Sequence, residues 1–417
     1  MARKMKDSSI EWIGEIPEGW SIARGKHILT LLQRTVFPTD GVITCFRDGE
    51  VTLRSNRRED GFTVSLKEIG YQGIEPGDLV VHGMDGFAGS IGISDSRGKS
   101  SPVLVVLDSS QDKKYLMYYL RSMAYNNVFL ALSTGIRVRS CDLKWNKLAD
   151  LLYLVPPIVE QHKLVSFLDE KCSEIDAMLS KTRASIEEYK KLKQAVITQA
   201  VTKGVRGERE MKDSGVEWIG EIPKEWDILN LVAHTSMLTP MRDRPENLDG
   251  PIPWIRIEDF DGKYISSSKA SLGVSKETVQ SMNLKIYPVG TILCTSSCIM
   301  GKCAIVSREL VSNQRFIGII PDQNTCENFL YYLMLSNSER MNYLATGALQ
   351  ANLSRSSFEH LKVQFPSYQE QKEIADYLDA KCAEIDRLIA KKEQLVKELE
   401  SYKKSLIYEV VTGKREV

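Results

Sequence analysis

Two stretches of the chain repeat apolar residues in alternating steps of four and three, the pattern of helices that pack along one narrow stripe. The first follows the segment VPPI and the second follows FPSY, and prolines of this kind mark helix starts. The stripe positions are Leu164, Leu168, Ile175, Leu179, Ile186, Tyr189, Val196 and Ala200, then Ile374, Leu378, Ile385, Ile389, Val396, Leu399, Leu406 and Val410. A run of about 40 residues makes a rod of roughly 60 Å. The sequence therefore predicts two long helices.

Polar residues interrupt both stripes. We predict core-position interruptions at Lys171, Thr182 and Lys193 in the first stripe, and at Lys381, Lys392 and Lys403 in the second. Such residues cost stability but fix register and partner. One interpretation pairs the two helices with each other, since each stripe is narrow and needs one partner. The alternative packs each helix on its own domain, with the lysines reaching to water.

The chain is also a tandem repeat. MKDSSIEWIGEIPEGW, from Met5, matches MKDSGVEWIGEIPKEW, from Met211, at 12 of 16 positions. EQHKLVSFLDEKCSEID, from Glu160, matches EQKEIADYLDAKCAEID, from Glu370, at 9 of 17 positions. Two similar helices can both bury their apolar stripes if they pack antiparallel about a pseudo-twofold axis. This packing would place the remaining domains at opposite ends and inverted.

The segments between these matches share a pattern but few residues. Both segments contain a turn, an apolar strand and a glycine-bearing loop before another strand. The corresponding stretches are IEPGDLVVHGMDGFAGSIGIS in the first segment and IYPVGTILCTSSCIMGKCAIVS in the second. The predicted unit is a variable α/β domain followed by a similar helix. We place the domains at 1–157 and 207–367, and the helices at 158–206 and 368–417.

Bulk composition narrows the function classes. Lys plus Arg and Asp plus Glu are 55 each, so a uniformly basic coat for nucleic acid is excluded, although a basic patch on one face is not. Apolar runs such as Val103 to Leu107 are too short to cross a bilayer, and we expect no membrane association and a cytoplasmic location. The Cys294, Cys298 and Cys303 cluster lacks the CxxC spacing of structural zinc sites, so buried thiols are the preferred interpretation and no metal is expected.

These motifs together resemble the specificity subunit of type I restriction-modification systems. The resemblance depends on the doubled EWIGEIP, the strand and loop at Gly77 to Gly89, the TG at Thr134 and Thr346, and the PPIVEQ and PSYQEQ helix entries. It covers essentially the whole chain. Each motif alone is weak, but their repeated order is specific. The cysteine-rich loop is a departure whose role the family pattern does not settle.

The resemblance implies an α/β (α+β) fold with two pseudo-symmetric target recognition domains containing mixed sheets, separated by two long antiparallel coiled-coil helices. Each domain would read one half of a bipartite site in double-stranded DNA, and the helices would set the spacer. It also implies that the helices dock two methyltransferase (modification) subunits and that restriction subunits join that core. S-adenosylmethionine, ATP and Mg would then belong to the partner subunits, and the chain would have no cofactor of its own.

The first domain carries two basic clusters on predicted loops. Arginine can bond bidentately to guanine and asparagine to adenine, and all of these side chains can also clamp phosphates. Solvated loops are the alternative interpretation. His82 would face the same groove or close a turn. The DNA-binding candidates are Arg47, Arg54, Asn56, Arg57 and Arg58, then Arg137, Arg139, Lys144 and Lys147.

The second domain offers the same kinds of side chain. They are Arg256, Gln314, Arg315, Gln350, Asn352 and Arg355. Side chain to backbone bonding is an alternative for Gln314 and Asn352.

The sequence lacks the marks of an enzyme. GFAGSIG does not have the spacing of a dinucleotide or methyl-donor loop, and VPPI is not the tetrapeptide of a methyltransferase. EDFDGK, from Glu258, is better explained by an Asp-Gly turn than by a nuclease site. We expect no catalytic residues. The competing hypothesis is a non-catalytic coiled-coil adaptor that binds protein or RNA.

Overall fold

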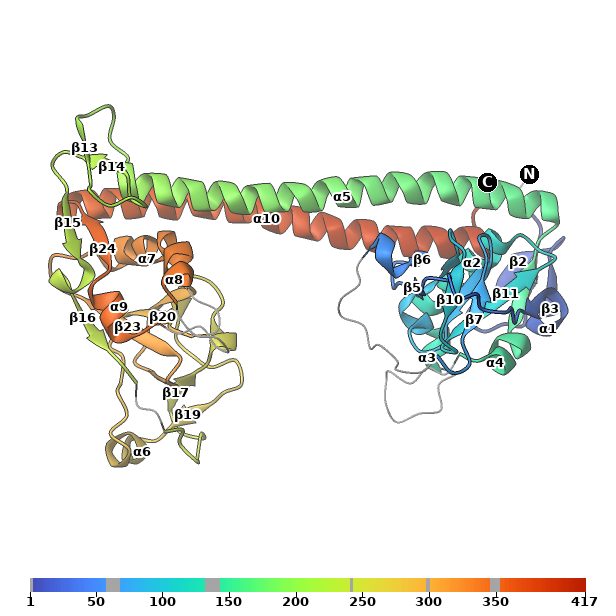
Figure 1. The fold of residues 1–417 in the computed structure, drawn as a ribbon, viewed down its shortest axis with the longest axis horizontal. Coiled ribbons are helices and arrows are strands. Elements are labelled where there is room, and N and C mark those ends of the chain that lie inside the picture. Colours follow the sequence, from blue (N-terminus) through green and yellow to red (C-terminus); the bar gives the residue numbers. More distant parts are fainter. Residues whose placement is uncertain (1–2, 58–67, 132–142, 241–242, 298–300, 346–352) are drawn as a thin grey trace. The chain divides into compact units, whose positions relative to one another are not determined.

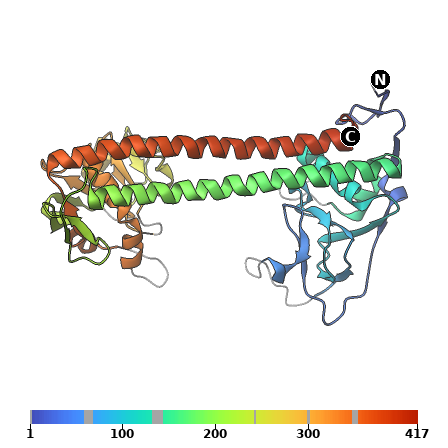
Figure 2. The same ribbon diagram turned by 90° about the horizontal axis from the view of Figure 1, so that it is seen from above.

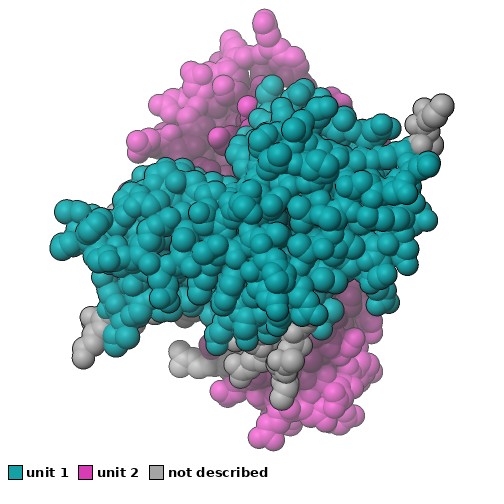
Figure 3. Space-filling view, turned by 90° about the vertical axis from the view of Figure 1, so that its right-hand side faces the viewer, with its two compact units in different colours: residues 1–183, 394–417 teal, residues 184–393 magenta. Residues whose placement is uncertain are grey.

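The computed structural model describes residues 3–57, 68–131, 143–240, 243–297, 301–345 and 353–417. The chain divides into two compact units (Figure 3). The first unit comprises residues 1–183 and 394–417, and the second comprises residues 184–393. Each unit contains one of the two variable domains and parts of both long helices. The candidate arginines Arg58, Arg137 and Arg139, together with Gln350, Asn352 and Cys298, lie outside the described residues.

Before the long helices, the first unit consists of short strands and short helices, of which α2 is the longest (Figure 1). Its elements before the long helix are β1 Met5–Asp7, β2 Glu15–Pro17, β3 Ser21–Arg24, α1 Gly25–Ile28, β4 Leu29–Leu31, β5 Ile43–Cys45, β6 Val51–Leu53, η1 Arg54–Asn56, β7 Gln72–Ile74, β8 Leu79–His82, η2 Gly86–Ala88, β9 Ile91–Ile93, β10 Gly98–Ser100, β11 Leu104–Ser109, α2 Lys113–Tyr125, α3 Val128–Ala131, α4 Trp145–Asp150 and β12 Leu152–Val155.

The main sheet of the first unit runs β4-β11-β8-β9 and is antiparallel throughout. Side chains alternate between its faces, so Leu79 and Val81 join the core beneath α2, whereas Val80 joins a second core with the β5–β6 hairpin. Both faces are therefore buried, which explains why β8 reads as a continuous apolar run. Asp112 caps α2 by accepting the N–H groups of Lys114 and Tyr115.

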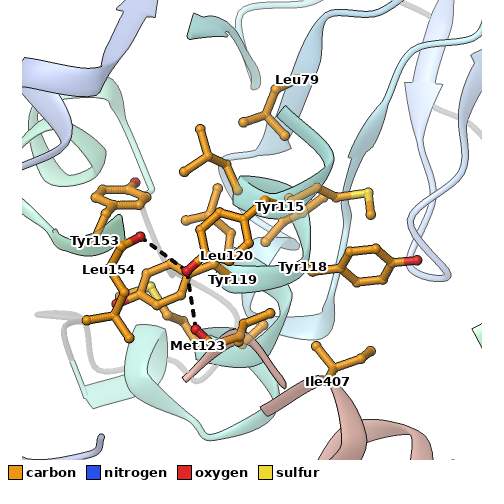
Figure 4. Close-up of a cluster of buried hydrophobic side chains, with 14 of the residues drawn as sticks. Leu79, Tyr115, Tyr118, Tyr119, Leu120, Met123, Tyr153, Leu154 and Ile407 are labelled. Atoms are coloured by element: carbon orange, nitrogen blue, oxygen red, sulfur yellow. Dashed lines mark hydrogen bonds between the residues drawn. The ribbon is translucent and has the colours of Figure 1, made fainter. Parts of the chain in front are cut away.

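A tyrosine cluster connects this core to the end of the second long helix (Figure 4). The buried Tyr115 hydroxyl lies 3.2 Å from the backbone oxygens of both Leu154 and Val411, which share its single proton. Tyr119 donates to the oxygen of Leu152 at 2.9 Å. A buried hydroxyl without a partner would be costly, so these bonds fix the helix end against the domain.

The second unit repeats the plan with different strands. Its elements before the second long helix are β13 Met211–Asp213, β14 Glu221–Pro223, β15 Asp227–Asn230, η3 Leu231–Ala233, β16 Thr235–Leu238, β17 Ile252–Ile255, η4 Ile257–Asp259, β18 Tyr264–Ile265, β19 Gly273–Val274, α6 Lys276–Ser281, β20 Ile292–Thr295, β21 Cys303–Val306, β22 Val311–Ser312, β23 Phe316–Pro321, α7 Glu327–Ser336, α8 Ser338–Leu344, α9 Arg355–Glu359 and β24 Lys362–Phe365.

The main sheet of the second unit runs β16-β23-β20-β21-β18 and is mixed, since β18 pairs in parallel with β21. The side chains of β20 again alternate between the two faces of the sheet, with Ile292 and Cys294 beneath α7 and Leu293 in a separate core. The α/β (α+β) fold class is confirmed. Among the described residues, parallel strand pairing belongs to the second unit, while the ladders of the first are antiparallel apart from isolated bridges.

The two long helices are α5, Ile158–Lys203, and α10, Tyr368–Val411 (Figure 2). In the first unit Asp176 pairs with Lys403 at 2.6 Å and Arg183 pairs with Glu400 at 2.5 Å. The partner's number falls as the residue number rises, so the helices are antiparallel there. The prediction of paired antiparallel helices is confirmed, and the alternative of two separately packed helices is wrong.

The second unit makes the same inter-helix contact. Lys193 pairs with Asp386 at 2.7 Å, and in the sequence repeat these residues correspond to Lys403 and Asp176. Lys392 lies 5.7 Å from the centre of the Tyr189 ring. The polar interruptions predicted at Lys193, Lys403 and Lys392 therefore take partners across the helix pair, as register-fixing residues do.

Two of the predicted interruptions are wrong. Lys171 is not a core residue, because it pairs with Glu174 on its own helix, and Lys381 likewise pairs with Glu384. The adjacent Cys172 and Cys382 occupy the buried positions, each 5% exposed. The stripe takes two steps of four before it settles into alternation, so counting three from Leu168 and Leu378 selects the wrong residue.

The doubled opening motif fastens each domain to the start of a long helix. In the first unit Arg3 pairs with Glu160 and lies 5.4 Å from the Trp20 ring. In the second unit Arg209 pairs with Glu370 at 2.6 Å and lies 5.2 Å from the Trp226 ring, and Trp226 Nε1 donates to Glu370. The same arginine, tryptophan and glutamate recur, so the repeated residues build a repeated joint.

Candidate nucleic-acid interface

Four of the predicted first-domain residues line one cavity of about 830 Å³: Arg47, Arg54, Arg57 and His82. They arrive from separate elements. Arg47 follows β5, Arg54 begins η1 after β6, and His82 ends β8. The walls also include Thr44, Phe46, Asp48 and Asp85. The β5–β6 hairpin and the end of β8 thus gather side chains that are 35 residues apart in sequence.

The arginines of the cavity have different partners. Arg57 pairs with Asp48 at 2.6 Å and Glu50 at 3.0 Å, and its guanidinium lies 4.3 Å from the centre of the Phe46 ring. The hydrogen bond with Asp48 raises the pKa of Arg57. Arg54 donates from Nε to Thr44 Oγ1 at 2.9 Å. The hairpin thereby holds its own arginines, and the cavity presents oriented guanidinium groups together with carboxylates.

His82 closes a turn at the edge of this cavity. Its Nδ1 accepts the N–H groups of Met84 at 3.3 Å and Asp85 at 3.0 Å, so the ring proton of the neutral form sits on Nε2. Burial lowers the pKa of His82 and outweighs the opposite effect of Asp85, and Arg47 lowers it further. His82 thus closes the turn and also lines the cavity, and its role in DNA binding stays a prediction.

The other described first-domain candidates lie elsewhere. Asn56 donates to Thr52 Oγ1 at 2.9 Å, a local bond that steadies η1. Lys144 precedes α4 and lines a different cavity of about 600 Å³ beside Arg34 and Trp145. Lys147 lies within α4. The structure therefore brings together four of the predicted first-domain residues and separates Lys144 from them.

The described second-domain candidates have separate local environments. Gln314 and Arg315 are exposed on the turn between β22 and β23, and Arg355 pairs with Glu359 along α9 at 2.7 Å. The Arg256 N–H donates to Asp259 at 2.7 Å at the start of η4, and the Arg256 Nε is buried. No hydrogen bond or ion pair between described residues joins any two of these four side chains. Their role in DNA binding stays a prediction.

Sequence reasoning missed the acidic and aromatic partners of the first cavity. Asp85 pairs with Arg47 at 3.1 Å, and Asp48 and Phe46 hold Arg57. The alternation of basic and acidic residues in FRDGE was the available signal. Asp85 had no such signal, because only the sheet brings the end of β8 beside the hairpin.

The cysteine-rich segment contains a pair of opposed thiols. Cys294 and Cys303 face each other across β20 and β21, with their sulfurs 2.7 Å apart, and both are buried. Burial raises the pKa of the Cys294 thiol. Among the described residues no group of three or more His, Cys, Asp or Glu side chains is placed to hold a metal ion. Nor does any helix in the described part of the chain have the length and apolar character needed to cross a membrane.

Comparison with known proteins gives consistent results. Residues 227–399 match the model of the type I restriction modification DNA specificity domain. A type I restriction enzyme MjaIX specificity subunit from Methanocaldococcus jannaschii is 34% identical over 181 residues, which are 42% of this chain and 41% of that protein. A putative MjaX specificity subunit from the same organism is 24% identical over 436 residues, 96% of this chain and 95% of the relative.

Solved structures share the fold. A chain from a study of complex assembly and conformational transition of the type I R-M system superposes with a TM-score of 0.74 at 12% identity, covering 96% of this chain and 99% of that one. The HsdS subunit of Thermoanaerobacter tengcongensis gives a TM-score of 0.52 at 13% identity, with 96% and 98% covered. The chain is therefore similar to type I restriction-modification specificity subunits, and its residues 227–399 match the DNA specificity domain of that family.

Proposed function

We propose that the chain recognises a bipartite site in double-stranded DNA, each variable domain reading one half. The recurrence of one joint and one inter-helix ion pair in both units carries this proposal. A protein that makes the same contacts twice with different variable segments is suited to two related tasks on unlike sequences. The cavity lined by Arg47, Arg54, Arg57 and His82 supplies hydrogen-bond donors of the kind that reads base edges.

The paired helices act as the spacer and as the docking site for two methyltransferase subunits. Helices of 46 and 44 residues correspond to about 69 Å and about 66 Å at 1.5 Å per residue. Their opposed ion pairs fix the register of the pair and therefore the length of the spacer. Restriction subunits join through this core, and the complex works in the cytoplasm.

The chain itself is non-catalytic. S-adenosylmethionine, ATP and Mg act in the partner subunits. The described residues line the first cavity with arginines already paired to carboxylates and a neutral histidine, a set suited to recognition more than to proton transfer.

Mapping of methylated motifs in genomic DNA, with and without this gene, tests the proposal. One split motif should lose methylation when the gene is deleted and regain it on complementation. An unchanged set of motifs, or retention of duplex binding by the complex without this chain, would instead support an adaptor for protein or RNA.

A further inference from the structure

Two arginines of the first cavity, Arg57 and Arg47, differ in how far the protein's own side chains occupy their guanidinium groups. Arg57 is held by two carboxylates and an aromatic ring on its own hairpin. Arginine in that arrangement serves to shape the hairpin, because both of its terminal nitrogens contact carboxylates and one face of its guanidinium lies against a ring. Arg57 is therefore a structural wall of the cavity.

Arg47 is the contrasting case. The described residues give its side chain one hydrogen-bonding partner, Asp85 Oδ1, which lies 3.1 Å from one Nη. The Arg47 side chain is 66% exposed, and it also lines the cavity. A carboxylate on one edge of the guanidinium orients the group while its other donors stay available to a ligand.

The carboxylate that holds Arg47 is itself fixed by a tight turn. The Asp85 N–H donates to His82 Nδ1 at 3.0 Å, and the Asp85 carbonyl accepts the Ala88 N–H at 2.9 Å as η2 begins. Gly89 closes this turn with a φ of 94°, a left-handed conformation that glycine adopts without strain. His82 is anchored in turn at the end of β8, which is paired on both sides.

We infer that Arg47 identifies a guanine in the first half-site, and that the His82–Asp85 turn is the device that positions it. This inference rests on the proposed function. Two donors of one guanidinium match the O6 and N7 acceptors of guanine, and this match distinguishes guanine from the other bases only if the guanidinium is held in one orientation. The contacts that link strand β8 to the His82–Asp85 turn, and the turn to the Asp85 carboxylate, supply that rigidity.

Substitution of Arg47 in the full chain, assembled with its partner subunits, tests the inference. Arg47→Ala should relax the methylated motif at one guanine of one half-site, with a roughly 5- to 150-fold loss of discrimination at that base pair and no change in the other half. Arg47→Lys keeps the positive charge but lacks the fork of donors, and it should relax the same position. Asp85→Ala should relax it partly, and Asp85→Asn, which keeps an acceptor, should restore part of the loss.

Arg24→Ala is the matched control. Arg24 is an exposed arginine of the same unit that faces one carboxylate, Asp150, at 3.8 Å, and it does not line the cavity. Its loss should leave the motif unchanged. Thermal unfolding and subunit assembly are measured for every variant, and Arg47→Lys keeps the test valid if Arg47→Ala does not assemble.

The outcomes separate the inference from the proposed function. If deletion of the gene abolishes the split motif but Arg47→Lys preserves every position, or if Arg47→Ala weakens the whole motif evenly in an assembled complex, Arg47 binds phosphate or nothing and the inference is wrong. If deletion leaves the methylated motifs unchanged, the proposed function itself fails.

Discussion

At the residue scale, the first cavity depends on a histidine that must remain neutral. Only the neutral ring of His82 can accept the N–H groups of Met84 and Asp85 at Nδ1. Burial and Arg47 lower the pKa of His82 in the folded protein, while Asp85 opposes them. A lowered pKa means that the unfolded state takes up the proton first, so the contribution of His82 to stability is complete above the unfolded pKa of about 6.5 and is lost as the pH falls through the folded pKa.

We therefore expect the turn to open in mild acid. Between about pH 7.5 and about pH 5, hydrogen–deuterium exchange of the peptide containing Met84 and Asp85 should lose protection after correction for intrinsic exchange. His82→Asn keeps an acceptor without titrating in this range, so its protection should fall less. His162→Asn, at an exposed histidine, is the control. Equal acid sensitivity of His82→Asn and the unmodified protein would contradict this account.

A second residue-scale feature is a lysine enclosed by aromatic rings. Lys263 pairs with Asp379, and its Nζ lies 5.6, 5.7 and 5.0 Å from the ring centres of Tyr264, Tyr331 and Tyr332. The Tyr332 hydroxyl also donates to Asp379. In the first unit Lys114 and Tyr118 bind Asp169 in the same way. There the lysine and the tyrosine both belong to α2. Both units thus use a lysine and a tyrosine to bind the equivalent aspartate of a long helix.

Lys263→Met should lower the free energy of unfolding by about 1–2 kcal/mol, because it removes a cation from a side chain only 17% exposed while keeping its apolar stem. Urea denaturation followed by circular dichroism measures the change. Lys269→Met, at a side chain 52% exposed and 3.4 Å from Asp261, should be nearly silent. Similar losses in the two variants would show that the enclosed position adds nothing.

At the scale of elements, the long helices followed from the sequence and the cavity did not. Apolar spacing predicted the extents of α5 and α10, because a helix repeats one local geometry and its burial stripe is visible in the residues. Lys171 and Lys381 were misplaced by one residue, since the exact phase depends on the partner helix. The meeting of Arg47, Arg57 and His82 depends on how short strands cross, and local spacing carries no record of that contact.

The inter-helix ion pairs give an element-scale prediction. Asp386→Lys sets two lysines against each other and should cost about 0.2–1 kcal/mol, because both groups are partly exposed. Adding Lys193→Asp should restore the melting temperature by recreating the pair with reversed polarity. Asp176→Lys with Lys403→Asp provides the matched experiment in the first unit. A double variant no more stable than Asp386→Lys would show that the pair does not fix the helices.

At the scale of the whole molecule, spacer length should follow helix length. Insertion of one heptad at equivalent points of both helices adds about 10.5 Å, or about three base pairs of DNA. The spacer of the methylated motif should lengthen accordingly, whereas insertion into one helix alone should prevent assembly, because it breaks the register of the ion pairs. Motif mapping of each variant decides the question, and an unchanged spacer at full methylation would argue against a ruler.

Modularity is the second whole-molecule prediction. Replacement of residues 227–369 by the corresponding segment of a type I specificity subunit should change one half of the methylated motif and leave the other half intact. The two units have separate cores, so neither depends on the other's variable residues for packing. Sequencing of methylated genomic DNA from cells with the chimera tests this expectation, and a change in both halves would exclude independent readout.

The repeated joint of arginine, tryptophan and glutamate has an evolutionary consequence. Its tryptophans and glutamates lie in the repeated stretches that border each variable segment, and its arginines lie two residues before the first of these stretches, so the two variable segments have similar ends. An exchange between such ends would deliver a foreign domain already equipped to fasten to its helix. New recognition could thus arise by shuffling intact cassettes, without the stepwise repair of a damaged interface that point mutation would demand.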